Sequence, residues 1–105
     1  MSGISPEKLR YLRNNVDISH VICCRLELPN KVRDSYLRFL CPLCSEFNTA
    51  VNPKTNLARC FACSKNFNPI DIVIATLQCS FLDAIYFLEN TALSHRQFAA
   101  LYRRR

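Results

Sequence analysis

Two pairs of cysteines place the strongest constraint on how this chain of 105 residues can fold. Cys41 and Cys44 form one C-x2-C pair, Cys60 and Cys63 form a second, and fifteen residues separate the two pairs. A turn with two intervening residues can present both of its sulfurs to one metal ion, at about 2.3 Å if the ion is zinc. Fifteen residues are enough for a hairpin that brings the second turn opposite the first. The pattern therefore predicts one structural Zn2+ ion held by four thiolates in a closed tetrahedral site.

Two other uses of these cysteines remain open from the sequence. A single C-x2-C pair can be a redox dithiol, although two pairs at this spacing are unusual for one. An iron–sulfur cluster also takes four cysteines, but ferredoxin cysteines are spaced differently. The remaining cysteines, Cys23, Cys24 and Cys79, fall outside the pattern, and the simplest interpretation is that they are small buried apolar residues.

Composition restricts the compartment and the partner. Seven cysteines would leave one unpaired in a secreted disulfide scaffold. Residues 2–15 are polar and charged and lack the apolar run of a signal peptide, and the apolar stretch 70–77 is too short to span a membrane. These features indicate a cytoplasmic protein with reduced thiols and no membrane association. The net charge of +6 favours an acidic partner such as nucleic acid.

Periodicity and turn residues predict an α+β fold in which a small antiparallel zinc-ribbon sheet is flanked by helices at both ends. Helices are expected over 6–14, 18–25, 69–78, 80–90 and 94–105, and strands within 26–40, over 49–51 and over 57–60. The expected buried stripes are Ile18, Val21, Ile22 and Leu26; Ile70, Val73, Ile74 and Leu77; and Phe81, Ile85 and Leu88. We expect one domain over 1–105, with a core at about 17–92 and two terminal helices as extensions.

Several short motifs give the chain a family resemblance. They are L-C-P-L-C at 40–44, V-N-P at 51–53, R-C-F-A-C at 59–63, I-D-I-V at 70–73 and S-F-L-D-A at 80–84. In this order they resemble the N-terminal zinc-binding domain of bacterial DnaG-type DNA primases. Cys44 stands where the bacterial family usually has histidine, so the four-cysteine set is similar to that of phage-type primases. Glycines that the family has around its second knuckle are missing here.

The resemblance implies a domain that helps to recognise single-stranded template beside a separate catalytic domain with metal-binding acids. In this chain the eight acids are scattered, without a clustered D-x-D. We therefore expect no primer synthesis from this chain alone, and the chain could be a piece of a longer primase.

The residues themselves also suggest a nucleic-acid surface. Strand alternation puts Tyr36 and Arg38 on one face and groups Arg59 with Phe61. Basic side chains can contact phosphates while aromatic rings stack on bases. The candidate binding residues are Tyr36, Arg38, Lys54, Arg59, Phe61 and Lys65. The alternative is a solvated basic face whose aromatic rings pack on the flanking helices.

Three functional hypotheses follow. The first is a module that binds single-stranded DNA in a replication or primase context. The second is an adaptor or accessory subunit whose flanking helices, over 4–12 and 81–101, dock on a replication or polymerase partner. An enzyme has the least support, because no nucleophile–base pair or open metal site is visible, and no small-molecule substrate is expected. The arginines at 103–105 are either a phosphate-binding tail or a basic helix end.

Overall fold

The computed structural model describes residues 4–91, 96–98 and 100. In chain order its elements are α1 (Pro6–Asn15), α2 (Ile18–His20), the π-helical turn η1 (Val21–Arg25), β1 (Asn30–Arg33), β2 (Tyr36–Phe39), β3 (Thr49–Asn52), β4 (Leu57–Cys60), β5 (Asn66–Phe67), α3 (Pro69–Leu77) and α4 (Phe81–Glu89). Residues 96–98 and 100 are also helical. The rest of the helix expected at 94–105, including the arginines at 103–105, lies outside the described residues.

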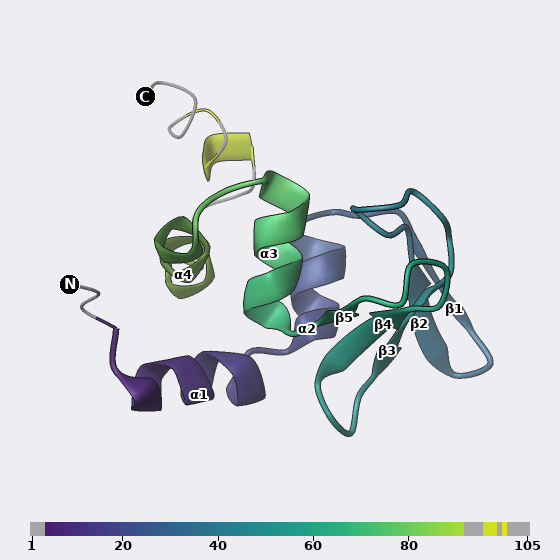
Figure 1. The fold of residues 1–105 in the computed structure, drawn as a ribbon, viewed down its shortest axis with the longest axis horizontal. Coiled ribbons are helices and arrows are strands. Elements are labelled where there is room, and N and C mark those ends of the chain that lie inside the picture. Colours follow the sequence, from purple (N-terminus) through teal and green to yellow (C-terminus); the bar gives the residue numbers. More distant parts are fainter. Residues whose placement is uncertain (1–3, 92–95, 99, 101–105) are drawn as a thin grey trace.

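The strands form one antiparallel sheet in the order β1-β2-β3-β4-β5, so each strand pairs with its neighbour in sequence. Figure 1 shows the helices gathered to one side of this sheet, with β1 as the strand furthest from them. The predicted α+β class, with a small sheet between helical segments, is confirmed. The two-residue strand β5 was not predicted, because two residues are too few to show an alternating pattern.

Turn residues other than glycine close the hairpins, as the composition requires. Asp34 and Ser35 join β1 to β2 with φ values of 53° and 68°. Positive φ at both central residues is the signature of the type I′ turn, whose twist matches that of the two strands. This turn lies within residues 26–40, where the sequence predicted strands.

From the end of β2 to β5, side chains alternate between a sealed face and an open face, whereas all of β1 is exposed. The residues that point to the helices are buried, and they are Phe39, Thr49, Val51, Ala58, Cys60 and Phe67. Their sequence neighbours on the opposite face are exposed or only partly buried. The described helices therefore cover one face of the sheet and leave the other exposed to solvent.

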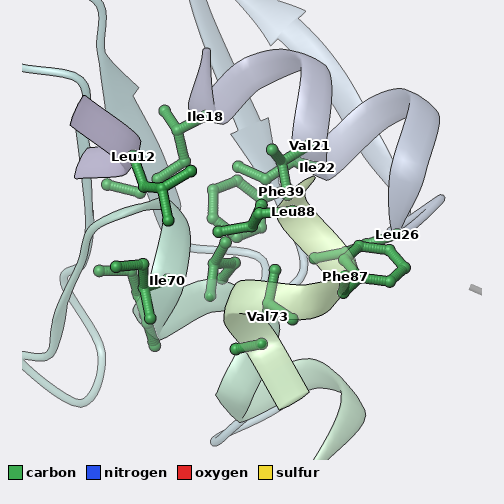
Figure 2. Close-up of a cluster of buried hydrophobic side chains, with 14 of the residues drawn as sticks. Leu12, Ile18, Val21, Ile22, Leu26, Phe39, Ile70, Val73, Phe87 and Leu88 are labelled. Atoms are coloured by element: carbon green, nitrogen blue, oxygen red, sulfur yellow. The ribbon is translucent and has the colours of Figure 1, made fainter. Parts of the chain in front are cut away.

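The hydrophobic core lies between the sealed face and the helices. Figure 2 shows Phe39 of β2 among Ile18, Val21 and Ile22 from the second helical segment. These side chains, like Leu26, are at most 3% exposed. The predicted stripe on this segment is therefore confirmed.

The stripes predicted for α3 and α4 were partly wrong. Ile70 and Val73 are buried as expected, but Ile74 and Leu77 are only partly buried. Phe81 is 43% exposed. It is the first residue of α4, and this end of the helix makes little contact with the core.

Phe87, which the predicted stripe omitted, is fully buried. Its ring packs edge-on against Phe98, with 5.4 Å between the ring centres, and the guanidinium of Arg25 lies 4.1 Å above its centre. Both partners come from other elements. Phe87 also lies three residues after the buried Ala84, so the buried face of α4 is wider than the predicted stripe.

Arg25 joins the start of the domain to its end. It is 8% exposed, and its guanidinium donates hydrogen bonds to the carbonyl oxygens of Phe87 at 2.7 Å and Asn90 at 3.1 Å. Burial lowers the pKa of this guanidinium. These carbonyls belong to the C-terminal turn of α4, where helical backbone has no partner of its own. Nothing in the local sequence pattern marked Arg25 as a buried residue.

Among the described residues, no single helix is long and apolar enough to cross a membrane. Only α3 and α4 taken together have the length and composition for a span, and they are bent by 112° at the break between them.

Asn56, in the turn between β3 and β4, fastens the sheet to the N-terminal helices. Its side-chain oxygen accepts a hydrogen bond from the Ile18 N–H at 3.0 Å. Its amide donates to the carbonyl oxygens of Arg13 at 2.8 Å and Val16 at 2.7 Å. Asn56 also has a φ of 59°, in the left-handed region that asparagine tolerates better than most residues. The Asn56 side chain thus binds backbone groups at the end of α1 and at the start of α2.

We expect Asn56→Ala to lower the free energy of unfolding of the zinc-loaded protein by about 2–3 kcal/mol, because it removes three hydrogen bonds of about 1 kcal/mol each. Urea denaturation followed by circular dichroism measures this. Asn56→Gly keeps the backbone conformation but removes the same bonds, so it should be destabilised similarly. A glycine variant as stable as the wild type would show that the side-chain bonds contribute nothing.

Candidate metal centre and adjoining sheet surface

The two C-x2-C turns lie side by side at one end of the sheet. Cys41 follows β2 closely, and Cys60 is the last residue of β4. Both strands pair with β3, and the register places Thr49 opposite both Phe39 and Cys60. The fifteen residues between the pairs therefore contain β3, the turn and all of β4 except Cys60, which is the hairpin that the spacing predicted.

The two turns share one backbone arrangement. In the first turn, the Cys41 N–H donates to the Glu46 carbonyl at 3.0 Å, and the Ser45 N–H donates to the Cys41 carbonyl at 3.0 Å. The second turn repeats both bonds, from Cys60 to Lys65 at 2.9 Å and from Ser64 to Cys60 at 2.8 Å. The serine after each pair has a positive φ, 63° in the first turn and 62° in the second. Glycine would adopt this conformation without strain, so serine here costs about 1 kcal/mol.

The four sulfurs form a compact cluster whose size fits zinc. All four Sγ atoms lie within 4.8 Å of one another, and the pairs across the two turns are 3.9 Å apart for Cys41 and Cys63 and 3.5 Å apart for Cys44 and Cys60. A regular tetrahedron with zinc–sulfur bonds of about 2.3 Å has sulfurs about 3.8 Å apart. The observed separations lie close to this value and far above a disulfide bond length. The predicted ligands, Cys41, Cys44, Cys60 and Cys63, are thus placed to bind one Zn2+ ion, which would cross-link the two turns.

Cys60 has the most thiolate-like environment of the four. It is fully buried, and burial alone would raise the pKa of its thiol. Backbone N–H groups of Cys63 and Ala62, together with the nearby Thr49 hydroxyl and the Cys44 thiol, more than offset burial and lower its pKa to about 6. Donors directed at a sulfur stabilise its anion, and they do the same for a metal-bound thiolate.

The more exposed cysteine of each turn has the opposite tendency. For Cys44, the Glu46 N–H lowers the pKa, but burial and the sulfurs of Cys60, Cys41 and Cys63 outweigh it and raise the pKa to about 12. For Cys63, burial raises the pKa, and the sulfurs of Cys60 and Cys41 add to this effect. Crowded sulfurs therefore resist carrying four negative charges together. A divalent cation supplies the missing compensation, which is why binding of the metal releases protons.

The other cysteines take no part in this cluster. Among the described residues, Cys41, Cys44, Cys60 and Cys63 are the one group of three or more cysteine, histidine or acidic side chains that could hold a metal. Cys79 is buried, as the sequence suggested, and Cys23 is partly buried. The same expectation was wrong for Cys24, which is exposed because it lies on the outer side of η1.

Comparison with protein families identifies the cluster. A family model described as CHC2 zinc finger, the zinc ribbon of DnaG, matches residues 4–101, nearly the whole chain. The chain belongs to the CHC2 zinc finger family. A comparison with curated proteins gives no match. This CHC2 zinc finger has Cys44 where the bacterial family usually has histidine, and its sulfur occupies a ligand position in the cluster. The resemblance to the zinc-binding domain of DnaG-type primases is confirmed.

The open face of the CHC2 zinc finger sheet is hollowed into a groove of about 460 Å³. Its lining includes four of the six residues predicted to bind nucleic acid, namely Tyr36, Arg38, Arg59 and Phe61. The rest of the lining comes from Ala50, Val51, Asn52, Thr55, Leu57, Ala58 and Asn66. The structure thus brings together residues from β2, from β4 and from the second cysteine turn.

The aromatic rings of the groove face solvent. Tyr36 is 48% exposed and Phe61 is 64% exposed, so the alternative in which they pack on the helices is wrong. The Arg59 guanidinium donates to the Asn66 side-chain oxygen at 3.1 Å and lies 6.0 Å from the centre of the Phe61 ring. The groove therefore presents exposed rings beside positive charge.

Two of the predicted residues lie elsewhere. Lys54 is exposed in the turn between β3 and β4, and Lys65 is exposed after the second cysteine turn. Neither of them lines the groove. Sequence reasoning could place both lysines in turns but could not specify how far those turns lie from the groove.

We expect Cys60→Ser to abolish stoichiometric zinc binding and cooperative unfolding, because the ion links the two turns and contributes on the order of 10 kcal/mol to folding in comparable sites. Metal analysis and thermal melting by circular dichroism test this, and chelation of the wild type should have the same effect. Cys24→Ser is the matched control, and it should retain both zinc and the melting transition. A Cys60→Ser variant that melts like the wild type would contradict the role of the metal.

We expect Thr49→Val to lower zinc affinity about 10- to 100-fold while keeping the fold. The Thr49 hydroxyl is buried opposite Cys60 and has no other hydrogen-bond partner among the described residues, so it is available to the Cys60 sulfur, and valine fills the same space without it. Competition with a chromophoric chelator measures the affinity. Thr49→Ser restores the hydroxyl and should recover most of it. Equal affinity in the valine variant and the wild type would exclude the hydroxyl as a contributor.

Proposed function

We propose that this CHC2 zinc finger binds single-stranded DNA on the open face of its sheet, in a DNA replication or primase context. The observation that carries the proposal is the groove in which Tyr36, Arg38, Arg59 and Phe61 meet. These residues are far apart in sequence, and only the pairing of β2, β3 and β4 assembles them. The zinc site supports the surface indirectly, because it holds the ends of β2 and β4 together.

Charge supports an anionic ligand. The five strands carry the basic residues Lys31, Arg33, Arg38 and Arg59 and no aspartate or glutamate. A phosphate backbone that crosses the sheet would therefore meet positive charge without a repelling carboxylate on the strands. Release of counterions from the nucleic acid then contributes to affinity and makes it dependent on salt.

The mixture of side chains favours a single strand over a duplex. Arginine side chains can bind phosphates, whereas Tyr36 and Phe61 offer flat, exposed ring surfaces. Bases can stack on such rings only when they are unpaired, and each stacked base contributes about 1–3 kcal/mol. Duplex DNA would use the charges but leave the rings unoccupied.

We assign no primer synthesis to this chain. In DnaG-type primases the zinc ribbon is a separate domain from the catalytic part, which carries metal-binding acids. Several acids of this chain already have structural roles: Asp17, Asp71 and Asp83 lie in the first turns or caps of α2, α3 and α4, and Glu89 forms an ion pair with Lys8 at 2.6 Å.

A second candidate function is an adaptor that docks on a replication or polymerase partner. It rests on an apolar groove of about 490 Å³ between α1 and α4, lined in part by Tyr11, Leu12 and Leu88. Tyr11 is 61% exposed, and Phe81, Leu82 and Tyr86 on α4 are 43–51% exposed. An adaptor would capture a protein partner through these helices and show no affinity for oligonucleotides.

We expect Arg38→Ala and Arg59→Ala each to weaken binding of a single-stranded oligonucleotide. Each should also reduce the slope of log K against log salt by about 0.7 for every phosphate that the protein no longer neutralises. Fluorescence anisotropy at several salt concentrations measures both quantities. Arg10→Ala is the matched control, since it removes the same charge from an exposed position on α1 outside the groove.

Unchanged affinity in the double variant Arg38→Ala/Arg59→Ala would place the site elsewhere. Tighter binding of duplex than of single-stranded DNA would contradict the role of the exposed rings. RNA oligonucleotides of the same sequence establish whether the sugar is distinguished.

A further inference from the structure

One row of residues crosses the open face from the first strand to the last. The register pairs Lys31 with Arg38, Arg38 with Ala50, Ala50 with Arg59, and Arg59 with Asn66. Residues directly opposite one another in a sheet point to the same face. The residues of this row from Arg38 to Asn66 line the groove, but Lys31 on β1 does not.

Lys31 meets an aromatic ring that belongs to neither the groove nor the buried core. Its Nζ atom lies 5.1 Å from the centre of the Phe47 ring. Phe47 comes three residues after Cys44, in the segment between the first cysteine turn and β3, and its side chain is partly buried. Phe47 is absent from the buried hydrophobic cluster.

This contact has a counterpart near the other end of the row, one strand before Asn66. There the Arg59 guanidinium lies 6.0 Å from the Phe61 ring, which belongs to the second cysteine turn. Each end of the row thus has one cation on a strand and one ring from a segment next to a cysteine turn. Between the two ends lie Arg38 and the small side chain of Ala50, which leaves room for a nucleic-acid backbone to approach the sheet.

We propose that Lys31 and Phe47 form a second nucleotide-binding position, so that a bound single strand runs across the β-strands from β4 to β1 instead of ending in the groove. The inference rests on the proposed function, because it extends the same surface. In it, Phe61 and Phe47 each stack one base, and Lys31, Arg38 and Arg59 neutralise the phosphates between them.

The dimensions and the charge agree with this path. Neighbouring strands are about 4.8 Å apart, so the three spacings from β1 to β4 amount to about 14 Å. A four-stranded RNA-recognition sheet stacks about two or three bases over a similar width. β1 is an edge strand on which every residue is exposed, so nothing among the described residues covers Lys31 from outside.

A purely structural role for Lys31 and Phe47 leads to a different expectation. If the two side chains only fasten the β1–β2 hairpin to the cysteine turn, their removal changes the melting temperature and leaves oligonucleotide binding unaltered in the folded protein. If they bind a nucleotide, their removal weakens binding only of oligonucleotides long enough to reach them.

The first test compares Phe47→Leu and Lys31→Ala with the wild type, using the zinc-loaded full chain and oligothymidylates from about two to about eight nucleotides. We expect Phe47→Leu to weaken binding of the longest oligomer about 5- to 100-fold, as removal of one stacked base does, and to leave the shortest unaffected. Phe47→Tyr and Lys31→Arg keep the ring and the charge and should bind like the wild type. Lys31 is exposed on the edge strand, so its variant tests the inference even if a substitution at Phe47 impairs folding.

The second test uses the unmodified protein. A single 5-iododeoxyuridine is placed at one end or the other of the longest oligomer, irradiated, and the cross-linked residue is identified by mass spectrometry. We expect one end to cross-link to Phe47 and the opposite end to Phe61, which also reveals the polarity of the strand.

Two negative results have different meanings. In the first, the protein binds oligonucleotides and cross-links at Phe61 or Tyr36 but not at Phe47, and neither variant has a length-dependent effect. This result would overturn the second position and leave the groove proposal intact. Absence of single-strand binding by the wild type would overturn the proposed function itself.

Discussion

The clustering of four cysteine sulfurs is the interaction on which the rest of the structure depends. The sheet has only short strands, and β2 meets β3 through just two residue pairs. Strands of this size are marginal by themselves. A metal that joins the end of β2 to the end of β4 reinforces this short β2–β3 pairing. The open face therefore keeps its shape without a second layer to cover it.

The sheet divides the molecule into a stabilising side and an available side. Phe39, Val51 and Phe67 face the helices and supply the core, whereas Arg38 and Arg59 face outward from strands of the same sheet. Because successive residues alternate, each strand contributes to both sides at once. A substitution on the open face can thus change binding with little effect on packing, which is what allows the surface to be tested by mutation.

Long-range polar contacts set how the helices sit against this sheet. Asn56 in a sheet turn binds backbone at the junction of α1 and α2, and Arg25 at the end of η1 binds the last turn of α4. Each contact satisfies helix-terminal backbone groups that would otherwise lack a partner. The junction of α1 and α2 is consequently attached to the sheet, and the end of α4 is attached to η1.

Local sequence determined the metal ligands through turn spacing, most helix and strand positions through capping and turn residues, and the face of Tyr36, Arg38, Arg59 and Phe61 through alternation. All of these are short-range properties of the chain. Only the tertiary structure decided the burial of Arg25 and its contact with Phe87, the exposure of Phe81 and Cys24, the bonds of Asn56, and the contact of Lys31 with Phe47. These depend on which segments pack together over long separations in the chain. Strand register and helix placement set such contacts, and neither leaves a periodic signal in the sequence.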